Sequence, residues 1–182
     1  MAAKHRKVKE HSFHYYYEDD VMVKLLVVYY SRTGHTKMMA EIVADAAIKE
    51  GAEVGLKEVS EASNDDLVWA DGIVIGSPVH FGLPAAEIKK FIDDSISVRR
   101  QLENKVGAAF ASSGHPTGGK ETTIMALLQA LLVHGMVVCG DPISSGGHYG
   151  AAATGEPDER SIKECTYLAK KVVMLASKLV KQ

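Results

Sequence analysis

The chain has 182 residues, of which 46% are hydrophobic, and its formal net charge at pH 7 is −2. This length supplies one sizeable core, so we expect one domain, and the nearly balanced charge gives no electrostatic reason to expect a nucleic acid partner. The two cysteines, Cys139 and Cys165, have no metal-binding spacing, which suits a reduced cytoplasmic protein without a metal site.

Residues 1–21 do not resemble the rest of the chain. The basic stretch Lys4–Lys9 is followed by histidines, tyrosines and acidic residues. No apolar core of a secretory signal follows the basic stretch, and no later segment approaches the ~20 apolar residues of a membrane span. We therefore expect an N-terminal extension over 1–21, a folded domain over 22–182, and a cytoplasmic location.

The segment 24–36 joins a predicted strand to a predicted helix. The apolar run Lys24–Tyr30 stops abruptly at Ser31, Arg32, Thr33, Gly34, His35 and Thr36, and a helical pattern follows at once. The free N–H groups of a helix's first turn favour a phosphate, and the hydroxyls add neutral donors. An ordinary N-cap is the alternative, but a cap needs only one hydroxyl. The segment lacks the Gly-Lys-Ser/Thr ending of a Walker loop, and it has one glycine where the dinucleotide-binding fingerprint needs three. Neither motif is therefore present.

Further elements alternate regularly between strand and helix. A helix is predicted from Thr36 to near Gly51, and the alternating segment Glu53–Val59 predicts a half-exposed edge strand. Continuous apolar runs at 73–75, 106–111 and 136–138 predict parallel strands covered on both faces, and helices are expected at about 85–102, 120–134 and 162–179. This alternation predicts an α/β doubly wound, five-stranded parallel sheet in the order 2-1-3-4-5, with helices on both faces.

The helix expected at 120–134 is apolar nearly all the way round. Such a helix is buried on every side, so a second subunit is one natural cover, and we expect at least a dimer. The long loop 141–158 is the alternative cover. A loop of that length is uncommon and often functional.

Three loops carry a resemblance to a known family. Ser31–Thr36 resembles the phosphate loop of flavodoxin-like proteins. Gly76–Gly82 and Ser112–Gly119 are similar to the flavin loops of the NAD(P)H:quinone oxidoreductases related to the tryptophan-repressor-binding protein. The resemblance covers about 23–179 and implies a flavodoxin-like fold, FMN as cofactor, NAD(P)H as electron donor and a homo-oligomer, either a dimer or a tetramer.

The resemblance also implies which residues act. FMN would be held by Ser31, Arg32, Thr33, Gly34, His35, Thr36, Pro78, Val79, His80, Phe81, Gly82, Ser112, Ser113, Gly114, His115, Thr117, Gly118 and Gly119. His134 and Tyr149 match family positions beside the flavin ring and are the expected catalytic residues, although His134 could also simply end a helix, where a cation suits the helix dipole.

The function expected is an FMN-dependent oxidoreductase that passes two electrons from NAD(P)H to a quinone or a similar small acceptor. His80, His115 and Lys120 in the ring-side loops favour a reduced, anionic flavin over the one-electron chemistry of an acidic flavodoxin. A flavodoxin-type electron carrier is the alternative. The chain also lacks the family's long insertion, at 59–72, and its tryptophan, at 95–101, so an NAD(P)H-dependent flavin reductase stays open.

Overall fold

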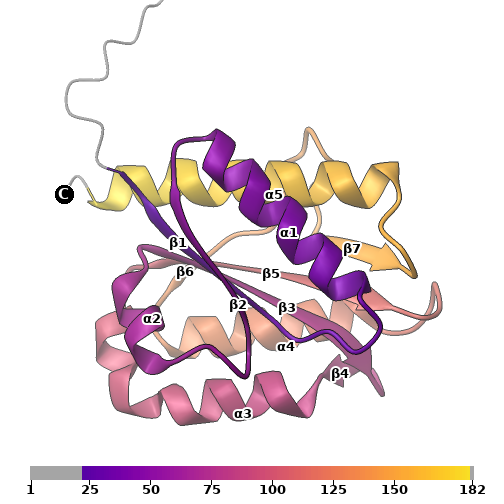
Figure 1. Ribbon diagram of the computed structural model, residues 1–182, viewed down its shortest axis with the longest axis horizontal. Coiled ribbons are helices and arrows are strands. Elements are labelled where there is room, and N and C mark those ends of the chain that lie inside the picture. The colour runs from indigo at the N-terminus through magenta and orange to yellow at the C-terminus, as the bar shows by residue number, and fades with distance from the viewer. Residues whose placement is uncertain (1–21, 181–182) are drawn as a thin grey trace, which may run out of the picture.

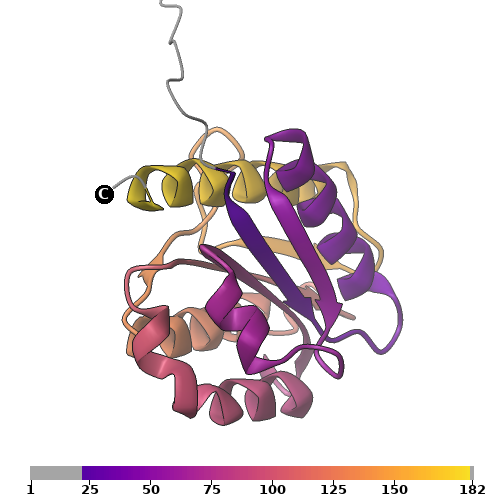
Figure 2. The same cartoon turned by 60° about the vertical axis from the view of Figure 1, so that its left-hand side comes forward.

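A computed structural model describes residues 22–180, so the predicted extension 1–21 lies outside the described residues. One sheet lies between two layers of helices (Figure 1). Helices α1 and α5 cover one face, and α2, α3 and α4 cover the other (Figure 2). The four longer strands are β2 (Glu53–Glu58), β1 (Lys24–Tyr29), β3 (Gly72–His80) and β5 (Val106–Ser113), which neighbour one another in that order. The flavodoxin-like, doubly wound arrangement expected from the sequence is confirmed.

The fifth strand of the predicted order is divided into two short pieces. Both β6 (Val137–Val138) and β7 (Ala151–Thr154) pair in parallel with β5, at its beginning and at its end. The prediction that 136–138 is covered on both faces is therefore wrong, because β6 is a two-residue edge strand in which Val137 is 43% exposed. The predicted loop 141–158 likewise contains β7, which shortens the irregular segment.

The helices follow the predicted spacing with two differences. Helices α1 (His35–Lys49), α4 (Lys120–Val133) and α5 (Glu159–Val180) confirm three predictions. The helix expected at 85–102 is instead the α-helix α3 (Ala86–Asp94), which continues as the 3-10 helix η1 (Ser95–Leu102). A short helix, α2 (Asn64–Trp69), and the two-residue strand β4 (Leu83–Pro84), antiparallel to β3, were not predicted.

The apolar side chains of the strands pack into two separate cores, one on each face of the sheet. Along β1, Leu25 and Val27 pack toward α1 and α5, whereas Leu26 and Val28 pack on the opposite side. Burying each such side chain stabilises the folded state by about 1.5–3 kcal/mol. Because both faces of a central strand are covered, apolar residues occupy consecutive positions along it. The alternating strand β2 lies at the sheet edge, as predicted.

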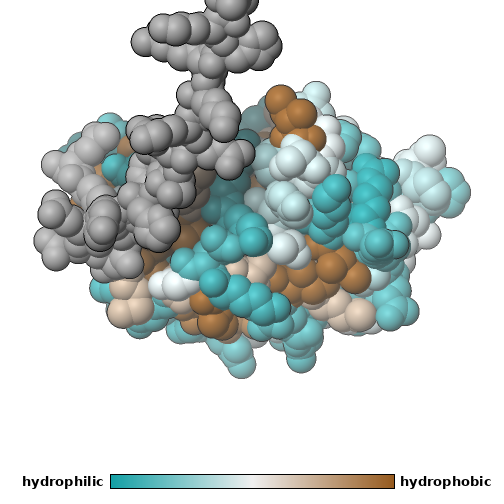
Figure 3. Space-filling view, turned by 90° about the horizontal axis from the view of Figure 1, so that it is seen from above, coloured by the Kyte–Doolittle hydropathy of each residue, from teal (hydrophilic) through white to brown (hydrophobic). Residues whose placement is uncertain are grey.

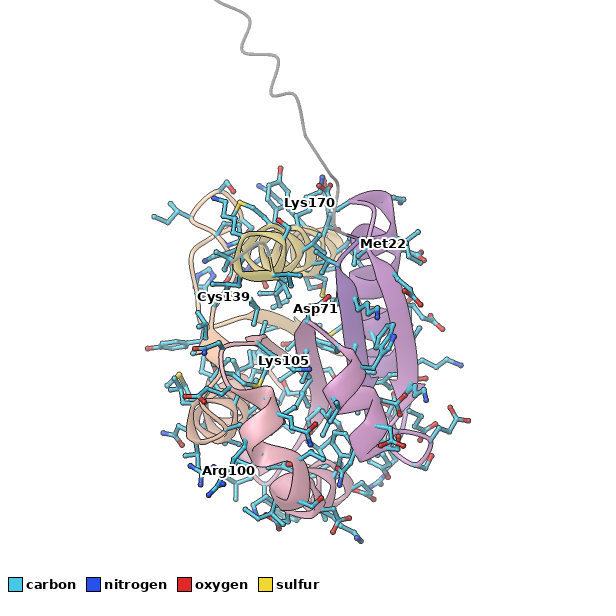
Figure 4. The ribbon with its side chains drawn as sticks, turned by 90° about the vertical axis from the view of Figure 1, so that its left-hand side faces the viewer. Met22, Asp71, Arg100, Lys105, Cys139 and Lys170 are labelled. Carbon is cyan, nitrogen blue, oxygen red and sulfur yellow. The ribbon has the colours of Figure 1, made fainter. Side chains whose placement is uncertain are left out.

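A half-buried lysine, Lys105, lies at the amino ends of the strands. The ammonium of Lys105 donates to the carbonyls of Leu67 at 3.0 Å and Val68 at 2.6 Å, and also to that of Ala70. These carbonyls end α2, so the lysine acts as its C-terminal cap. Burial lowers the pKa of Lys105, and the nearby Asp71 carboxylate partly offsets this. Figure 4 views this edge, with Lys105 and Asp71 near its centre.

The outer surface of α1 and α5 is mixed in character. Figure 3 shows hydrophobic patches there among hydrophilic residues. Ile48 of α1 and Ile162 of α5 are both exposed. Among residues 22–180, no helix combines the length and the apolar character needed to cross a membrane.

Candidate functional site

Three loops meet at the carboxyl edge of the sheet, on the right in Figure 1. β1, β3 and β5 are parallel neighbours, so the loops that follow them leave the sheet at the same edge. The loops are 31–36, 78–83 and 113–119. Doubly wound sheets bind ligands at this edge, where neighbouring connections diverge.

The first loop ends at a helix without a side-chain cap. Gly34 is the N-cap of α1, its φ is 95°, and no side chain of the described chain caps the helix there. The amide of Gly34 donates to the Ser31 hydroxyl at 3.1 Å, and the first helical bond runs from the Met38 amide to the Gly34 carbonyl at 2.9 Å. The backbone amides before Met38, up to that of Lys37, have no helical carbonyl to donate to. Such amides donate hydrogen bonds to a phosphate at a helix N-terminus.

The hydroxyls of this loop point in different directions. Arg32 and Thr33 are exposed, and the Thr33 hydroxyl lies 3.5 Å from Nδ1 of His35. Thr36 is buried, and its hydroxyl lies 2.7 Å from that of Ser112. Thr36 therefore joins the first loop to the third.

The second loop is held by a buried serine. Ser77 accepts a hydrogen bond from the Ala85 amide at 2.9 Å and donates to the Pro78 carbonyl at 2.8 Å. Between these points, Val79 and His80 pair with β4 in a tight antiparallel turn. The serine thus closes the base of the loop.

The tip of the second loop carries a strained, exposed aromatic residue. Phe81 has a φ of 54° and its side chain is fully exposed. A bulky residue in the left-handed region is uncommon and often marks a functional position. Beside it, the rings of His80 and Tyr30 meet edge to face, with centroids 6.2 Å apart. A hydrogen bond to Glu87 raises the pKa of Tyr30.

The third loop is folded tightly on its own polar groups. The Ser113 hydroxyl donates to the His115 carbonyl at 2.7 Å, and the Gly118 amide donates to the same carbonyl at 3.0 Å. A Cβ at Gly118 would lie 2.9 Å from that oxygen, so this turn has no room for a side chain. Gly114 and Thr117 are exposed in the same loop.

The second and third loops touch each other at glycines. Gly119 has a φ of 99°, and a Cβ there would lie 2.9 Å from the Cα of Gly82. The Thr122 hydroxyl donates to the Gly82 carbonyl at 2.7 Å. Gly119 is also the N-cap of α4, again without a side-chain cap. Two helices therefore begin at this edge with free amides, α1 at one loop and α4 at another.

This arrangement fits a flat ring that carries a phosphate. The uncapped start of α1 has space above it, because a Cβ at Gly34 would meet no atom within 4 Å. The glycines at 82 and 119 let two loop backbones approach closely, as an edge-on ring requires. The residues predicted from sequence to hold FMN are thus gathered at one edge.

The two predicted catalytic residues lie elsewhere in the single chain. His134 ends α4, whose beginning is at the third loop, so this histidine lies at the amino edge of the sheet. Its Nε2 is 2.7 Å from the Ser95 hydroxyl and its Nδ1 is 2.7 Å from the Ala130 carbonyl oxygen. Within one copy, the chain does not bring His134 to the three loops.

Tyr149 borders a different hollow. A cleft of about 410 Å³ lies between α4, α5 and residues 147–150, and Tyr149, Glu121 and Arg160 line it. At its base Glu164 is buried and accepts hydrogen bonds from Arg160 Nε at 2.7 Å and the Ala152 amide at 3.2 Å. The ion pair raises the pKa of Arg160. No residue of the three loops lines this cleft, although Glu121 lies two positions after the third loop.

Burial disfavours the nucleophilic thiolate form of both cysteines. Burial raises the pKa of Cys139 to about 11 and also raises that of the fully buried Cys165. Within the described range, 22–180, no group of three or more histidine, cysteine or acidic side chains is placed to hold a metal.

Sequence reasoning missed residues that hold the loops rather than line them. Ser77 and Thr122 anchor the second loop, and Tyr30 supports His80. Ser77 sits in the quoted Gly76–Gly82 motif, so its position was visible. The reach of Thr122 to Gly82 depends on packing between α4 and β4, which no local pattern contains.

Comparisons with known proteins agree with this geometry. A family model described as a flavodoxin domain matches residues 26–134. A flavodoxin of Aquifex aeolicus is 42% identical over 158 residues, which cover 83% of this chain and 85% of that protein. An NAD(P)H dehydrogenase (quinone) of Archaeoglobus fulgidus is 36% identical over 190 residues, covering 87% of this chain and 100% of the relative.

Solved structures agree as well. A WrbA-like flavodoxin from Agrobacterium tumefaciens has a TM-score of 0.74 and 27% identity, and the match covers 86% of this chain and 98% of that one. The chain belongs to the flavodoxin domain family.

Proposed function

We propose that this flavodoxin-family chain is an FMN-dependent oxidoreductase that passes two electrons from NAD(P)H to a quinone or a similar small acceptor. The observation that carries the proposal is the charge of the ring-side loops. Residues 78–82 and 112–119 contain no carboxylate, and His80, His115 and Lys120 lie in them or directly after them. A positive charge, such as that of Lys120, or a hydrogen-bond donor stabilises a ring that has gained negative charge.

Each loop has a part in this function. The amides at the start of α1, with Ser31 and Thr33, would hold the phosphate. Val79, His80 and Phe81 would flank the ring, and the loop 113–119 would offer backbone donors to its polar edge. When bound, FMN supplies hydride acceptance from the nicotinamide and transfer of two electrons to the acceptor. The protein supplies placement, and the rigid turn at Gly118 keeps the donors fixed.

The relatives support two activities. Several are named NAD(P)H dehydrogenase (quinone), at 32–36% identity, and one at 42% identity is named flavodoxin. A flavodoxin-type carrier is therefore the second candidate. The absence of carboxylates from the ring-side loops favours the enzyme, because acidic surroundings oppose formation of the reduced anion.

A second copy of the chain would complete the substrate side. Leu132 and Val133, at the end of α4, are 55% and 63% exposed, and Ile143 in the loop after β6 is 91% exposed. These apolar side chains favour contact with another subunit. Such a contact would bring His134 or Tyr149 to the partner's flavin, so we tie their catalytic role to an oligomer. A cytoplasmic location is part of the same proposal and suits the free cysteines.

The test is reconstitution with FMN followed by steady-state assays with NADH and NADPH. Benzoquinone, free FMN and ferricyanide serve as acceptors, and benzoquinone should be reduced in a ping-pong pattern. Photoreduction should pass to the fully reduced flavin without accumulating a one-electron form. If neither nucleotide reduced the bound flavin faster than it reduces free FMN, the carrier would replace the enzyme.

A further inference from the structure

The cleft between α4 and α5 has the size and the lining of a small-molecule site. Its volume is about 410 Å³, and sites for small ligands usually measure about 300–1,000 Å³. Ile124 and Ala152 give it apolar walls, and the half-exposed Tyr149 adds an aromatic ring. Gly147 and Gly150 line it too, so part of its wall is backbone. A flat, partly polar ligand suits this lining.

Two charged side chains in the cleft keep hydrogen-bonding capacity for a ligand. Glu121 is exposed, and among the described residues no cationic side chain lies within 4.0 Å of its carboxylate. Arg160 uses its Nε in the 2.7 Å ion pair with the buried Glu164. The other N–H groups of this guanidinium are available as donors. The cleft therefore offers a free acceptor and a fixed donor.

The charge of the cleft is negative overall. Its lining holds two carboxylates and one guanidinium, with His148 counted as neutral. Glu164 already balances Arg160, so the charge of Glu121 is left over. Glu121 lies in the first turn of α4, where an acid suits the helix dipole. In a cleft without a ligand, that would be its whole role.

The cleft lies at the same edge of the sheet as the three loops. Helix α4 begins directly after the third loop. Helix α5 begins after β7, which ends at Thr154, the partner of Ser113 at the end of β5 (Figure 1). A long ligand can thus extend from the ring-side loops past the start of α4 into the cleft. In the oligomer proposed above, Tyr149 would also place the cleft beside the partner's flavin.

We propose, as an extension that rests on the proposed function, that this cleft binds the adenosine end of the electron-donating dinucleotide and that Glu121 makes the protein selective for NADH over NADPH. The apolar wall and the Tyr149 ring would take the base. The Glu121 carboxylate would accept hydrogen bonds from the ribose hydroxyls, and Arg160 would donate to the diphosphate. An acid that receives the ribose 2′-hydroxyl repels the 2′-phosphate of NADPH.

The ratio of the KM values for the two nucleotides tests the role of Glu121. FMN-loaded wild type should have a KM for NADPH on the order of tenfold above that for NADH. The kcat values should be similar, because the 2′-phosphate is remote from the reacting atoms. Glu121→Gln keeps the shape of the side chain and removes its charge. The KM for NADH should therefore rise, that for NADPH should fall, and their ratio should approach one.

Arg160 should affect both nucleotides alike. Arg160→Lys keeps a positive charge beside Glu164 but loses the planar fork that matches a diphosphate. The KM values for NADH and NADPH should rise by a similar factor, and their ratio should stay at the wild-type value. A change in the ratio would contradict the separate roles given to Arg160 and Glu121.

The matched control removes the same charge from a neighbouring helix start. Glu159 is exposed in the first turn of α5 and does not line the cleft. Glu159→Gln should leave the ratio of the KM values unchanged. A fall equal to that in Glu121→Gln would assign the selectivity to general surface charge and would overturn the role of Glu121.

Nucleotide fragments test the cleft without turnover. ADP reproduces the adenosine end of NADH, and adenosine 2′,5′-bisphosphate adds the 2′-phosphate of NADPH. In calorimetric titrations of FMN-loaded protein, wild type should bind ADP more tightly than the bisphosphate. Glu121→Gln should weaken ADP binding on the order of tenfold and strengthen that of the bisphosphate. Equal ADP affinities of wild type and Glu121→Gln would overturn the assignment.

The outcomes separate the cleft from the proposed function. If neither nucleotide reduced the bound FMN although ADP bound in a way that depends on Glu121, the proposed function would fall and the cleft would stand as a nucleotide site. If both nucleotides reduced FMN with equal KM values and ADP bound equally to Glu121→Gln, only the cleft assignment would fall. A lower KM for NADPH than for NADH would likewise overturn the role of Glu121.

Discussion

The hydroxyls of Thr36 and Ser112 lie 2.7 Å apart, although 76 positions separate the two residues in the chain. Thr36 ends the first loop, Ser112 of β5 directly precedes the third, and both are buried. The bond ties the start of α1 to the end of β5, so the first and third loops are held at a fixed separation.

Removing this bond should weaken both folding and FMN binding. Thr36→Val keeps the shape but leaves the buried Ser112 hydroxyl without this partner, which should cost about 1–3 kcal/mol of unfolding free energy. Thr33→Val removes an exposed hydroxyl and should weaken FMN binding while leaving the fold unchanged. Urea unfolding and FMN titration measure the two effects. Equal stability of Thr36→Val and wild type would show that the bond contributes nothing.

The contact between Gly119 and Gly82 should be needed for FMN binding. Gly119→Ala adds a Cβ 2.9 Å from the Gly82 Cα and forces an alanine to a φ of 99°. Gly51→Ala is the matched control, since its φ is 85° and its Cβ would meet no atom within 4 Å. Both variants should lose about 1–2 kcal/mol through backbone strain. Only Gly119→Ala should lose FMN affinity, and equal affinities in a fluorescence titration would contradict the role given to this contact.

His134 should matter for stability before it matters for catalysis. His134→Ala and Ser95→Ala both break the 2.7 Å contact between these side chains, and each should cost about 1–3 kcal/mol without changing FMN affinity. Turnover separates the two variants. If a second copy carries His134 to the flavin, kcat/KM for benzoquinone falls about 10²-fold in His134→Ala and stays near wild type in Ser95→Ala. Equal kcat/KM values in both variants would leave His134 a structural residue.

Asp158 should make the fold sensitive to acid. It precedes α5 and accepts hydrogen bonds from the Ser161 hydroxyl at 2.7 Å and the Ser161 amide at 2.8 Å, and these lower its pKa from 3.8. Because the folded pKa lies below the unfolded one, the carboxylate's contribution is complete well above pH 3.8 and is lost as the pH falls further.

Asp158→Asn keeps a capping side chain that does not titrate. The unfolding free energies of wild type and Asp158→Asn should therefore converge as the pH is lowered from 5 toward 3. Asp158→Ala should be about 1 kcal/mol less stable than wild type at neutral pH. A difference between wild type and Asp158→Asn that stays constant over this range would contradict the assignment.

The parts of the fold that repeat along the chain were predictable from the sequence. Continuous apolar runs mark β3 and β5 because both faces of these strands are covered, and helical spacing marks α1 and α5. The split edge strand was not predictable, because Ala151–Thr154 offers only three small alanines and a threonine and pairs with β5 through a contact distant in sequence. Helix α2 was missed because its six residues are too short for a periodic pattern.

The candidate site likewise has parts that the sequence predicts and a part that it does not. The loops could be located from sequence, since parallel strands end together. His134 could not, because a family motif assigns a residue to a site without saying which copy of the chain provides it. The direction of α4 decides the matter, as it carries the helix end away from the loops that its first residue adjoins.

In the proposed function, the two helix starts without side-chain caps also link folding to the supply of cofactor. FMN bound there would bind the folded chain and not the unfolded one, so the free energy of unfolding would rise with its concentration. At one hundred times the dissociation constant the gain is about 2.7 kcal/mol. For a chain of this size that corresponds to a melting temperature about 5–10 °C higher. Cells short of riboflavin would therefore hold less of this protein, because degradation acts on the unfolded fraction.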